Sequence, residues 1–415
     1  MPSPARHSLA VIGAGPIGLE VAAAALENGL DVHVFERGEI GAHLLAWGHV
    51  RMFTPWRMNV GPASARLLAR HGWTAPEPGA RPTGAEMVER LLAPLAAAPE
   101  LAGRVHAHVQ VVHVSRRGML KGEAIGDPAR AAHPFRVLAR DAGGRESLLH
   151  AFAVVDASGV YGTPNWAGTG GIPARGETYL APRMSYRCDD VAGLRRERHA
   201  GRRTLVIGGG ATAATTVAAL AELATLAPGT SVAWATRQAD PSRPAPTPDD
   251  PLPAREALLA AAAAFRSGAN PAVSWLGGVE VDGFEYNTGT HRYRVNFFDR
   301  QGGRSRVEEA DEVVVNTGFG PDDSLYRELQ IHECYASRGP MKLSAALLGA
   351  GAADADCLAV PAMGVDLLRN PEPGFWILGA KSYARYNTFL LQAGYEQVAE
   401  VVAEMARGVA ARAGA

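Results

Sequence analysis

The feature that most constrains the fold of this 415-residue chain is a pattern that occurs twice. In the first copy, an apolar run at residues 9–12 leads into Gly13-Ala-Gly-Pro-Ile-Gly18. An alanine-rich segment at 19–28 follows, and a second apolar run at 31–35 closes the unit. The order predicts a strand, a tight glycine turn, a helix and a second strand.

The second copy of the pattern begins at residue 204. An apolar run at 204–207 precedes Gly208-Gly-Gly-Ala-Thr-Ala213, a helical segment reaches about residue 227, and a further apolar run occupies 231–235. Segments with the alternating pattern of strands follow each copy. The last of them is an apolar run, at 151–155 after the first copy and at 312–315 after the second. The sequence therefore predicts an α/β chain with two Rossmann-like dinucleotide-binding domains, each built on a parallel sheet.

The glycines of the first copy fit the backbone requirements of a dinucleotide loop. Gly13 suits the tight turn, Gly15 allows the backbone to approach a pyrophosphate, and Gly18 allows the helix to pack closely on the strand. The helix N-terminus offers free N–H groups and a positive dipole end to phosphate. Glu36 ends the second strand, where an acid binds a ribose hydroxyl. We therefore expect the first unit to bind a dinucleotide, the alternative being a glycine turn that serves only packing.

The second copy has no acid at the corresponding place. Its second strand ends in Thr236-Arg237. A guanidinium there suits a 2′-phosphate, because it pairs with phosphate through two parallel hydrogen bonds. The pattern favours NADPH over NADH, and the competing interpretation is an exposed arginine at a strand end of an arginine-rich chain.

Composition excludes several other classes of protein. The net charge of -1 lacks the basic excess of a nucleic-acid binder, so no nucleic-acid partner is expected. No apolar run reaches the ~18 residues of a membrane helix, and cleavage of a signal peptide would remove the first strand. We expect a cytoplasmic protein with no membrane association.

No metal site is expected either. The cysteines form no CxxC pair, and the three histidines between residues 106 and 113 do not share one face of a strand. Cys188 has both arginine and aspartate neighbours, and we expect it to be incidental rather than catalytic. Cys334 and Cys357 are expected to be packing or surface residues.

The two glycine motifs, each trailed by strand segments, resemble those of the two-dinucleotide-binding-domain flavoproteins, which include flavin-containing monooxygenases, thioredoxin reductases and bacillithiol disulfide reductase. The resemblance extends over nearly the whole chain. It implies that the first unit holds FAD and that an NADPH-binding unit is inserted within it. The implied boundaries are 1–170 and 325–415 for the FAD domain and 171–324 for the NAD(P)H domain.

Further segments resemble the family's cofactor contacts. They are the strand at 105–114, the Asp-Ala-Ser-Gly segment ending at Gly159, and the closing segment at 375–379 with a helix from Thr388. Where many relatives have an aspartate after the closing glycine, this chain has Ala380. The expected FAD contacts are Gly13, Gly15, Pro16, Ile17, Gly18, Glu36, Arg37, Trp47, Val111, Ser158, Gly159, Gly379 and Thr388. The expected NADPH contacts are Gly208, Gly210, Ala211, Thr212, Thr236 and Arg237.

Members of this family differ in the group or molecule that takes electrons from the reduced flavin. Without CxxC, the chain is unlike thioredoxin reductases, and the resemblance implies first an NADPH-using monooxygenase that attacks a small organic substrate through a flavin hydroperoxide. The usual monooxygenase signature is matched only at Gly176 in the segment 174–184. Two alternatives stay open: a reductase or oxidase of a small thiol, disulfide or quinone-like acceptor, and a cofactor-binding, redox-responsive partner protein.

No catalytic residue is identified by the sequence, but four are candidates. Arg51, Trp56 and Asn59 belong to a segment expected to pass near the flavin, and Asn387 precedes the last helix. A core-filling loop is the equally weighted alternative for the first three. The partner is a small molecule of aromatic or mostly apolar character, and a homodimer is the prior expectation for the oligomeric state.

Overall fold

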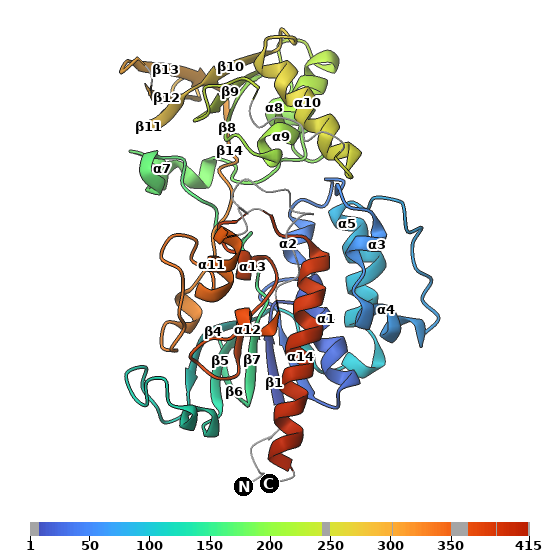
Figure 1. Cartoon of the computed structure of the whole chain (residues 1–415). Coiled ribbons are helices and arrows are strands. Elements are labelled where there is room, and N and C mark those ends of the chain that lie inside the picture. The colour runs from blue at the N-terminus through green and yellow to red at the C-terminus, as the bar shows by residue number, and fades with distance from the viewer. Residues whose placement is uncertain (1–7, 243–249, 301, 350–363, 387, 414–415) are drawn as a thin grey trace. The chain divides into compact units, whose positions relative to one another are not determined.

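The computed structural model describes residues 8–242, 250–300, 302–349, 364–386 and 388–413, which divide into two compact units (Figure 1). Unit 1 comprises residues up to 48, 54–163 and from 320 onward, and unit 2 comprises 49–53 and 164–319. The segments that join the units pair with each other, since Pro164 and Phe319 form an antiparallel bridge. The sequence placed the boundaries slightly later in both cases, at 170/171 and 324/325.

Unit 1 contains a five-stranded, wholly parallel sheet. Its order is β15-β7-β1-β2-β3, and the strands are β1 (Ser8–Ile12), β2 (Asp31–Phe35), β3 (Val105–His106), β7 (Ala153–Asp156) and β15 (Phe375–Ile377). All residues of β1, β7 and β15 are buried. A parallel sheet is normally covered on both of its faces, and its strands are therefore mostly apolar, as these are.

Helix α1 (Pro16–Glu27) connects β1 to β2 and packs against the long α14 (Leu391–Ala413), as Figure 1 shows in blue and red. Gly394 permits the close approach, because a side chain there would collide with Ile17. The sequence predicted that this last helix begins at Thr388, whereas α14 begins three residues later. Asn387 lies outside the described residues. The other helices of unit 1 are α2 (Ala42–Leu45), α3 (Trp56–Asn59), α4 (Pro62–Ala69), α5 (Gly84–Met87), α6 (Ala93–Ala96), α11 (Met341–Gly349), α12 (Val365–Leu368) and α13 (Ala380–Tyr383).

An antiparallel sheet follows in unit 1, formed by β4 (Val109–Arg116), β5 (Phe135–Asp141) and β6 (Glu146–Ala151). The prediction of one strand over 105–114 was wrong. His108 has a φ of 57°, a left-handed conformation that interrupts the strand. Its two halves consequently join different sheets, β3 pairing with β2 and β4 with β5.

Unit 2 repeats the plan with a four-stranded parallel sheet in the order β10-β9-β8-β14. The strands are β8 (Arg203–Ile207), β9 (Ser231–Thr236), β10 (Val273–Gly277) and β14 (Glu312–Val315), and the helices are α7 (Glu177–Leu180), α8 (Arg196–His199), α9 (Ala211–Leu226) and α10 (Pro253–Arg266). An antiparallel meander of β11 (Val279–Asn287), β12 (Arg292–Asp299) and β13 (Ser305–Ala310) completes it. Helix α10 begins at Pro253, and residues 243–249 before it lie outside the described ranges.

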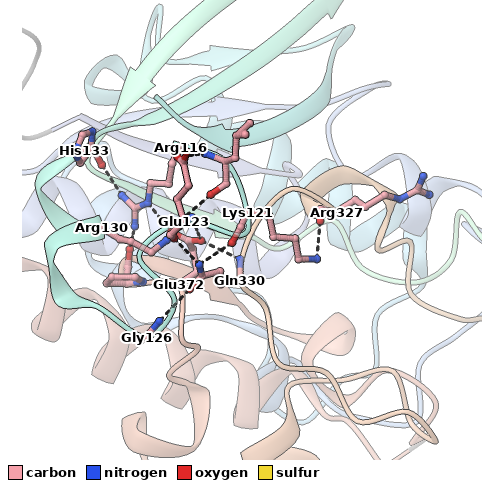
Figure 2. A network of polar contacts seen from close by, with 11 residues as sticks. Arg116, Lys121, Glu123, Gly126, Arg130, His133, Arg327, Gln330 and Glu372 are labelled. Carbon is pink, nitrogen blue, oxygen red and sulfur yellow. Dashed lines mark hydrogen bonds and ion pairs between the residues drawn. The ribbon is translucent and has the colours of Figure 1, made fainter. Parts of the chain in front are cut away.

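A buried charge cluster fixes the connection between β4 and β5 (Figure 2). Glu372 accepts from Arg116 at 2.6 Å and from Arg130 at 2.7 Å, and all three side chains are buried. The backbone N–H of Gln330 donates to the same carboxylate at 2.9 Å. Arg116 also lies over the Phe135 ring, 3.6 Å from its centroid.

The remaining donors of the two arginines bind backbone carbonyls. Arg130 donates to the carbonyls of Leu120 and Glu123, and Arg116 donates to that of His133. Gln330 donates to the Glu123 carbonyl as well. One carboxylate therefore anchors the segment 117–134 to a part of the chain more than 200 residues away.

No helix among the described residues is long and apolar enough to cross a membrane.

Glu372→Gln should destabilise the protein by about 3–5 kcal/mol, because two buried guanidinium groups lose their counter-charge. The hydrogen bonds outweigh burial and hold the pKa of Glu372 below its ordinary value of 4.5. A lowered carboxylate pKa gives stability that is present above the unfolded-state pKa and is lost as the pH falls through the folded-state pKa. The difference in unfolding free energy between wild type and variant should thus shrink below about pH 4.5 in urea titrations.

The matched control is Glu146→Gln, which breaks the ion pair of the half-exposed Arg140 and Glu146. Such a surface pair contributes at most about 1 kcal/mol. Equal destabilisation by the two variants would contradict the importance assigned to the buried cluster.

Candidate functional site

The turn between β1 and α1 brings two stretches of backbone into direct contact. A side chain at Gly18 would overlap the Gly13 carbonyl oxygen. Gly13 has a φ of 101°, and a Cβ there would lie 2.8 Å from the Ala157 carbonyl oxygen. Gly15, in contrast, has an ordinary φ of -86° and open space where its side chain would be. Gly13 and Gly18 are thus required by the fold, whereas the absence of a side chain at Gly15 leaves room for something else.

The N-terminus of α1 faces that open space. Its N-cap is Gly15, no side chain caps the helix, and no acidic residue lies in the first turn. Pro16 occupies the first helical position and has no N–H to satisfy. The remaining free N–H groups and the positive end of the helix dipole favour a bound anion.

Glu36 is held at the end of β2 by the glycine turn. Its Oε2 accepts the N–H of Ala14 and its Oε1 that of Gly38, both at 2.9 Å. Each carboxylate oxygen keeps a second lone pair. The carboxylate is therefore rigid and can still accept from a sugar hydroxyl.

These groups line a cavity of about 370 Å³ that lies within unit 1. Eleven of the thirteen predicted FAD contacts border it: Gly13, Gly15, Pro16, Ile17, Glu36, Arg37, Trp47, Val111, Ser158, Gly159 and Gly379. Gly18 is not among them because it is packed against Gly13. Thr388 is also not among them; its hydroxyl is buried and has no hydrogen-bond partner among the described residues.

Several polar residues that the sequence did not single out line the cavity, among them His43, Tyr161, Asp322 and Lys381. The His43 and Tyr161 rings are 5.9 Å apart between centroids. Burial acts to raise the pKa of Asp322, but hydrogen bonds from Ser324 and the charges of Lys381 and Arg37 outweigh it and lower the pKa. Both signs of charge therefore meet at this cavity.

Lys381 belongs to a buried polar cluster at the end of β7. Its Nζ lies 2.6 Å from Asp156 Oδ2 and 3.1 Å from Ser158 Oγ. The Ser158 hydroxyl donates to Asp156 Oδ1 at 2.6 Å. Asp156 and Lys381 are both almost completely buried. The Asp-Ala-Ser-Gly segment is consequently tied to α13 by an ion pair.

The predicted catalytic candidates do not gather at the cavity. The Asn59 side chain bonds Thr54 and the Pro55 carbonyl, and its own carbonyl accepts from Tyr395 at 2.7 Å. Trp56 is buried beneath the Arg90 guanidinium. These two residues fill the core, as in the alternative interpretation, but they belong to the short helix α3 and not to a loop. Arg51 is exposed and belongs to unit 2.

Unit 2 contains a second loop of the same design. Gly208 has a φ of 138°, and a side chain there would overlap the Asn316 carbonyl. The N-terminus of α9 is capped by no side chain and has no acid in its first turn, while Gly210 again faces open space. The buried indole of Trp234 donates to the Gly208 carbonyl at 2.7 Å and holds the turn in place.

The predicted NADPH contacts at this second loop differ in their exposure to solvent. Gly210 and Ala211 are exposed, and Thr212 is half-buried beside them in the first turn of α9. Thr236 is buried, and its hydroxyl bonds the Gln238 carbonyl and the Trp275 indole. Arg237 is exposed at the carboxyl end of β9.

The cysteines offer no redox pair within the described residues. Cys188 is buried and receives a hydrogen bond from Thr216. Burial raises the pKa of the Cys188 thiol, and the adjacent aspartates raise it further. Cys334 is free and partly exposed, and Cys357 lies outside the described residues. No group of three or more metal-ligating side chains was found in the described part of the chain.

Comparison with known proteins identifies the fold. A model of the pyridine nucleotide-disulphide oxidoreductase family matches residues 8–41, which contain the first loop and Glu36. A search of curated proteins gave no match. Bacillithiol disulfide reductase from Bacillus cereus is 17% identical with a TM-score of 0.67, and the match covers 97% of this chain and 99% of that one.

Two monooxygenase structures are similar over the same length. A cadaverine monooxygenase from Erwinia amylovora, bound to FAD, is 12% identical with a TM-score of 0.63, covering 98% of this chain and 95% of that one. An ornithine N-hydroxylase from Kutzneria, with reduced FAD, NADP⁺ and L-ornithine, is 17% identical with a TM-score of 0.59, covering 98% and 99%. At these identities the likeness establishes the fold of two Rossmann-like domains, as the duplicated glycine motif predicted.

Gly15→Ala should leave the fold intact and weaken dinucleotide binding. The methyl group enters open space with an allowed φ, so the free energy of unfolding should change by no more than about 1 kcal/mol. It would, however, occupy the place where a pyrophosphate approaches the backbone. Titration of the flavin-free chain with FAD, together with urea unfolding, measures both effects.

Gly18→Ala is the matched comparison, because its methyl group would overlap the Gly13 carbonyl. It should cost roughly 3 kcal/mol of stability through overpacking. A Gly15→Ala protein that binds FAD as tightly as wild type would contradict the assigned position of the phosphates.

Proposed function

We propose that this chain is an FAD-dependent oxidoreductase that takes its electrons from NADPH. The observation that carries the proposal is the pair of glycine loops, each followed by a helix whose N-terminus has no capping side chain. In unit 1 the loop borders a cavity of about 370 Å³, within the range of small-molecule and cofactor sites. Solved flavoproteins with both cofactors share the fold.

In unit 1 the residues present fit FAD. The α1 N-terminus faces the position of a pyrophosphate, Glu36 can accept from the adenosine ribose, and Val111 borders the cavity as an apolar wall for the adenine. When bound, FAD accepts hydride from the nicotinamide and delivers electrons to an acceptor. The chain supplies binding, orientation and a site protected from water.

In unit 2 the exposed N-terminus of α9 would hold the pyrophosphate of NADPH. Arg237, exposed at the carboxyl end of β9, would pair with the 2′-phosphate. The buried Trp234 supports this loop, since its indole bonds the Gly208 carbonyl.

For the acceptor, we propose O₂, with monooxygenation of a small organic molecule as the activity. The sequence has no CxxC, and the Cys188 thiol is buried with a raised pKa, so this thiol is not suited to relay electrons. Electrons would therefore pass directly from the flavin to a small acceptor. Two of the similar structures are amine monooxygenases, which favours primary amines as the first substrates to test.

The second candidate is direct reduction of a low-molecular-weight disulfide. It is favoured by the likeness to bacillithiol disulfide reductase, which covers 97% of this chain with a TM-score of 0.67. This activity too needs no dithiol pair in the sequence, so the two candidates must be separated by experiment.

Oxidation of NADPH by the FAD-loaded chain, followed with and without O₂, separates the candidates. A monooxygenase should consume O₂, form a hydroxylated product from an amine panel, and stay inactive with disulfides under anaerobic conditions. Anaerobic turnover of a small disulfide would instead establish the reductase. Tight binding of both cofactors without turnover of any acceptor would favour a redox-responsive partner protein.

Arg237→Ala should weaken NADPH binding by about tenfold or more while NADH affinity changes little, because only the 2′-phosphate loses its partner. The dissociation constants can be measured from nicotinamide fluorescence. Arg300→Ala, at an exposed arginine on the meander of the same unit, is the control. Equal losses for NADPH and NADH would overturn the assignment of Arg237.

A further inference from the structure

Lys381 stands out from the other cations of the chain. Lysine occurs only at Lys121, Lys342 and Lys381, whereas arginine supplies the rest of the positive charge. Of these lysines, Lys381 alone is buried and alone lines the unit 1 cavity. A compact ammonium therefore occupies this internal position beside the cavity.

The packing around Lys381 places it beside the first phosphate loop. Its partner Ser158 adjoins Gly13, since a Cβ on Gly13 would lie 3.0 Å from the Ser158 Cα. Gly379, two residues before the lysine, packs against Ile17 in the first turn of α1, where a Cβ would lie 2.9 Å from the isoleucine side chain. The lysine thus bridges two segments that both contact the β1–α1 turn.

The hydrogen bonds of Lys381 are incompletely used by the protein. An ammonium has three N–H donors, and two acceptors are present among the described residues, Asp156 Oδ2 and Ser158 Oγ. The Tyr326 ring lies beneath the ammonium, with its centroid 5.1 Å from Nζ. The third donor has no hydrogen-bond acceptor among the described residues.

The charge of Lys381 also reaches the cavity. It contributes to lowering the pKa of the Asp322 carboxyl, which borders the same space. A buried ion pair is seldom a gain in stability over apolar residues of the same size, because both charges lose their hydration. Because the pair of Lys381 and Asp156 lies at the wall of the cavity, we look for a role of the cation in ligand binding as well as in folding.

We propose that Lys381 pairs with the pyrophosphate of the dinucleotide bound in unit 1 and is a determinant of its affinity. The proposal rests on the proposed FAD site. The α1 N-terminus presents only about half a unit of positive charge, whereas a pyrophosphate has two negative charges. The ammonium, although paired with Asp156, belongs to a segment that contacts the first turn of α1 and adds a charged donor to the wall of the cavity. Asp156 holds the lysine in place, and its two oxygens are used by Ser158 and Lys381.

The experiment compares FAD with riboflavin, which has the same ring and ribityl chain but no phosphate. The flavin-free, full-length chain is titrated with each, and flavin fluorescence gives the dissociation constants. Lys381→Met/Asp156→Asn removes both charges, so no buried charge is left unpaired. The double variant should bind FAD at least tenfold more weakly and riboflavin within twofold of wild type.

The control is Lys342→Met, at an exposed lysine outside the cavity, which should change neither constant. If circular dichroism shows the double variant unfolded, Lys381→Gln replaces it, because its amide can still donate to Asp156. Unchanged FAD affinity, or an equal loss for FAD and riboflavin, would overturn the role of Lys381. A wild-type chain that binds neither flavin would overturn the FAD site itself.

Discussion

The contact between Gly13 and Gly18 is the constraint on which unit 1 depends. With no side chain between them, α1 starts directly against the end of β1, and the same turn presents its N–H groups to the cavity. Glu36 secures the turn from the next strand by binding the Ala14 N–H. Ile17, one residue from Gly18, then serves as the contact point for Gly379 and Gly394. Local backbone geometry and the placement of distant C-terminal segments are therefore set by the same few residues.

Much of this architecture follows from the sequence alone, because its signals are local. A glycine turn between an apolar run and an alanine-rich segment predicts the strand, the turn and the helix together, and Glu36 stands at a fixed spacing from them. Most expected FAD contacts border the cavity for the same reason. The break at His108 was missed because nothing in an alternating run of valines and histidines marks a residue with positive φ. The segment around Asn59 was ambiguous, since tryptophan and asparagine suit a ligand wall and a packed core segment equally. The hydrogen bonds of Asn59 to Thr54 and Pro55 show that it is part of the core.

Lys381 shows what sequence reasoning lacks. Asp156 and Ser158 lie more than 200 residues before it, so no spacing rule connects them. The one signal available was compositional: Lys381 is one of only three lysines in an arginine-rich chain. The proposed chemistry divides accordingly. The glycine loop and helix N-terminus proposed to bind phosphate are local motifs, whereas the proposed contribution of Lys381 depends on contacts made only when the chain is folded. The acceptor of the electrons depends on still finer detail, because disulfide reductase and monooxygenase structures share this fold.

The position of Glu372 also bears on the order in which the molecule is made. Arg116 and Arg130 emerge from the ribosome long before their carboxylate, and β15, which completes the parallel sheet beside β7, follows three residues after it. The described part of unit 2, apart from 49–53, is contained within 164–319 and is synthesised in between. Unit 2 can therefore acquire its fold on the growing chain before Glu372, the partner of the two arginines of unit 1, is synthesised. The cluster thereby makes completion of unit 1 depend on a segment that is synthesised after unit 2.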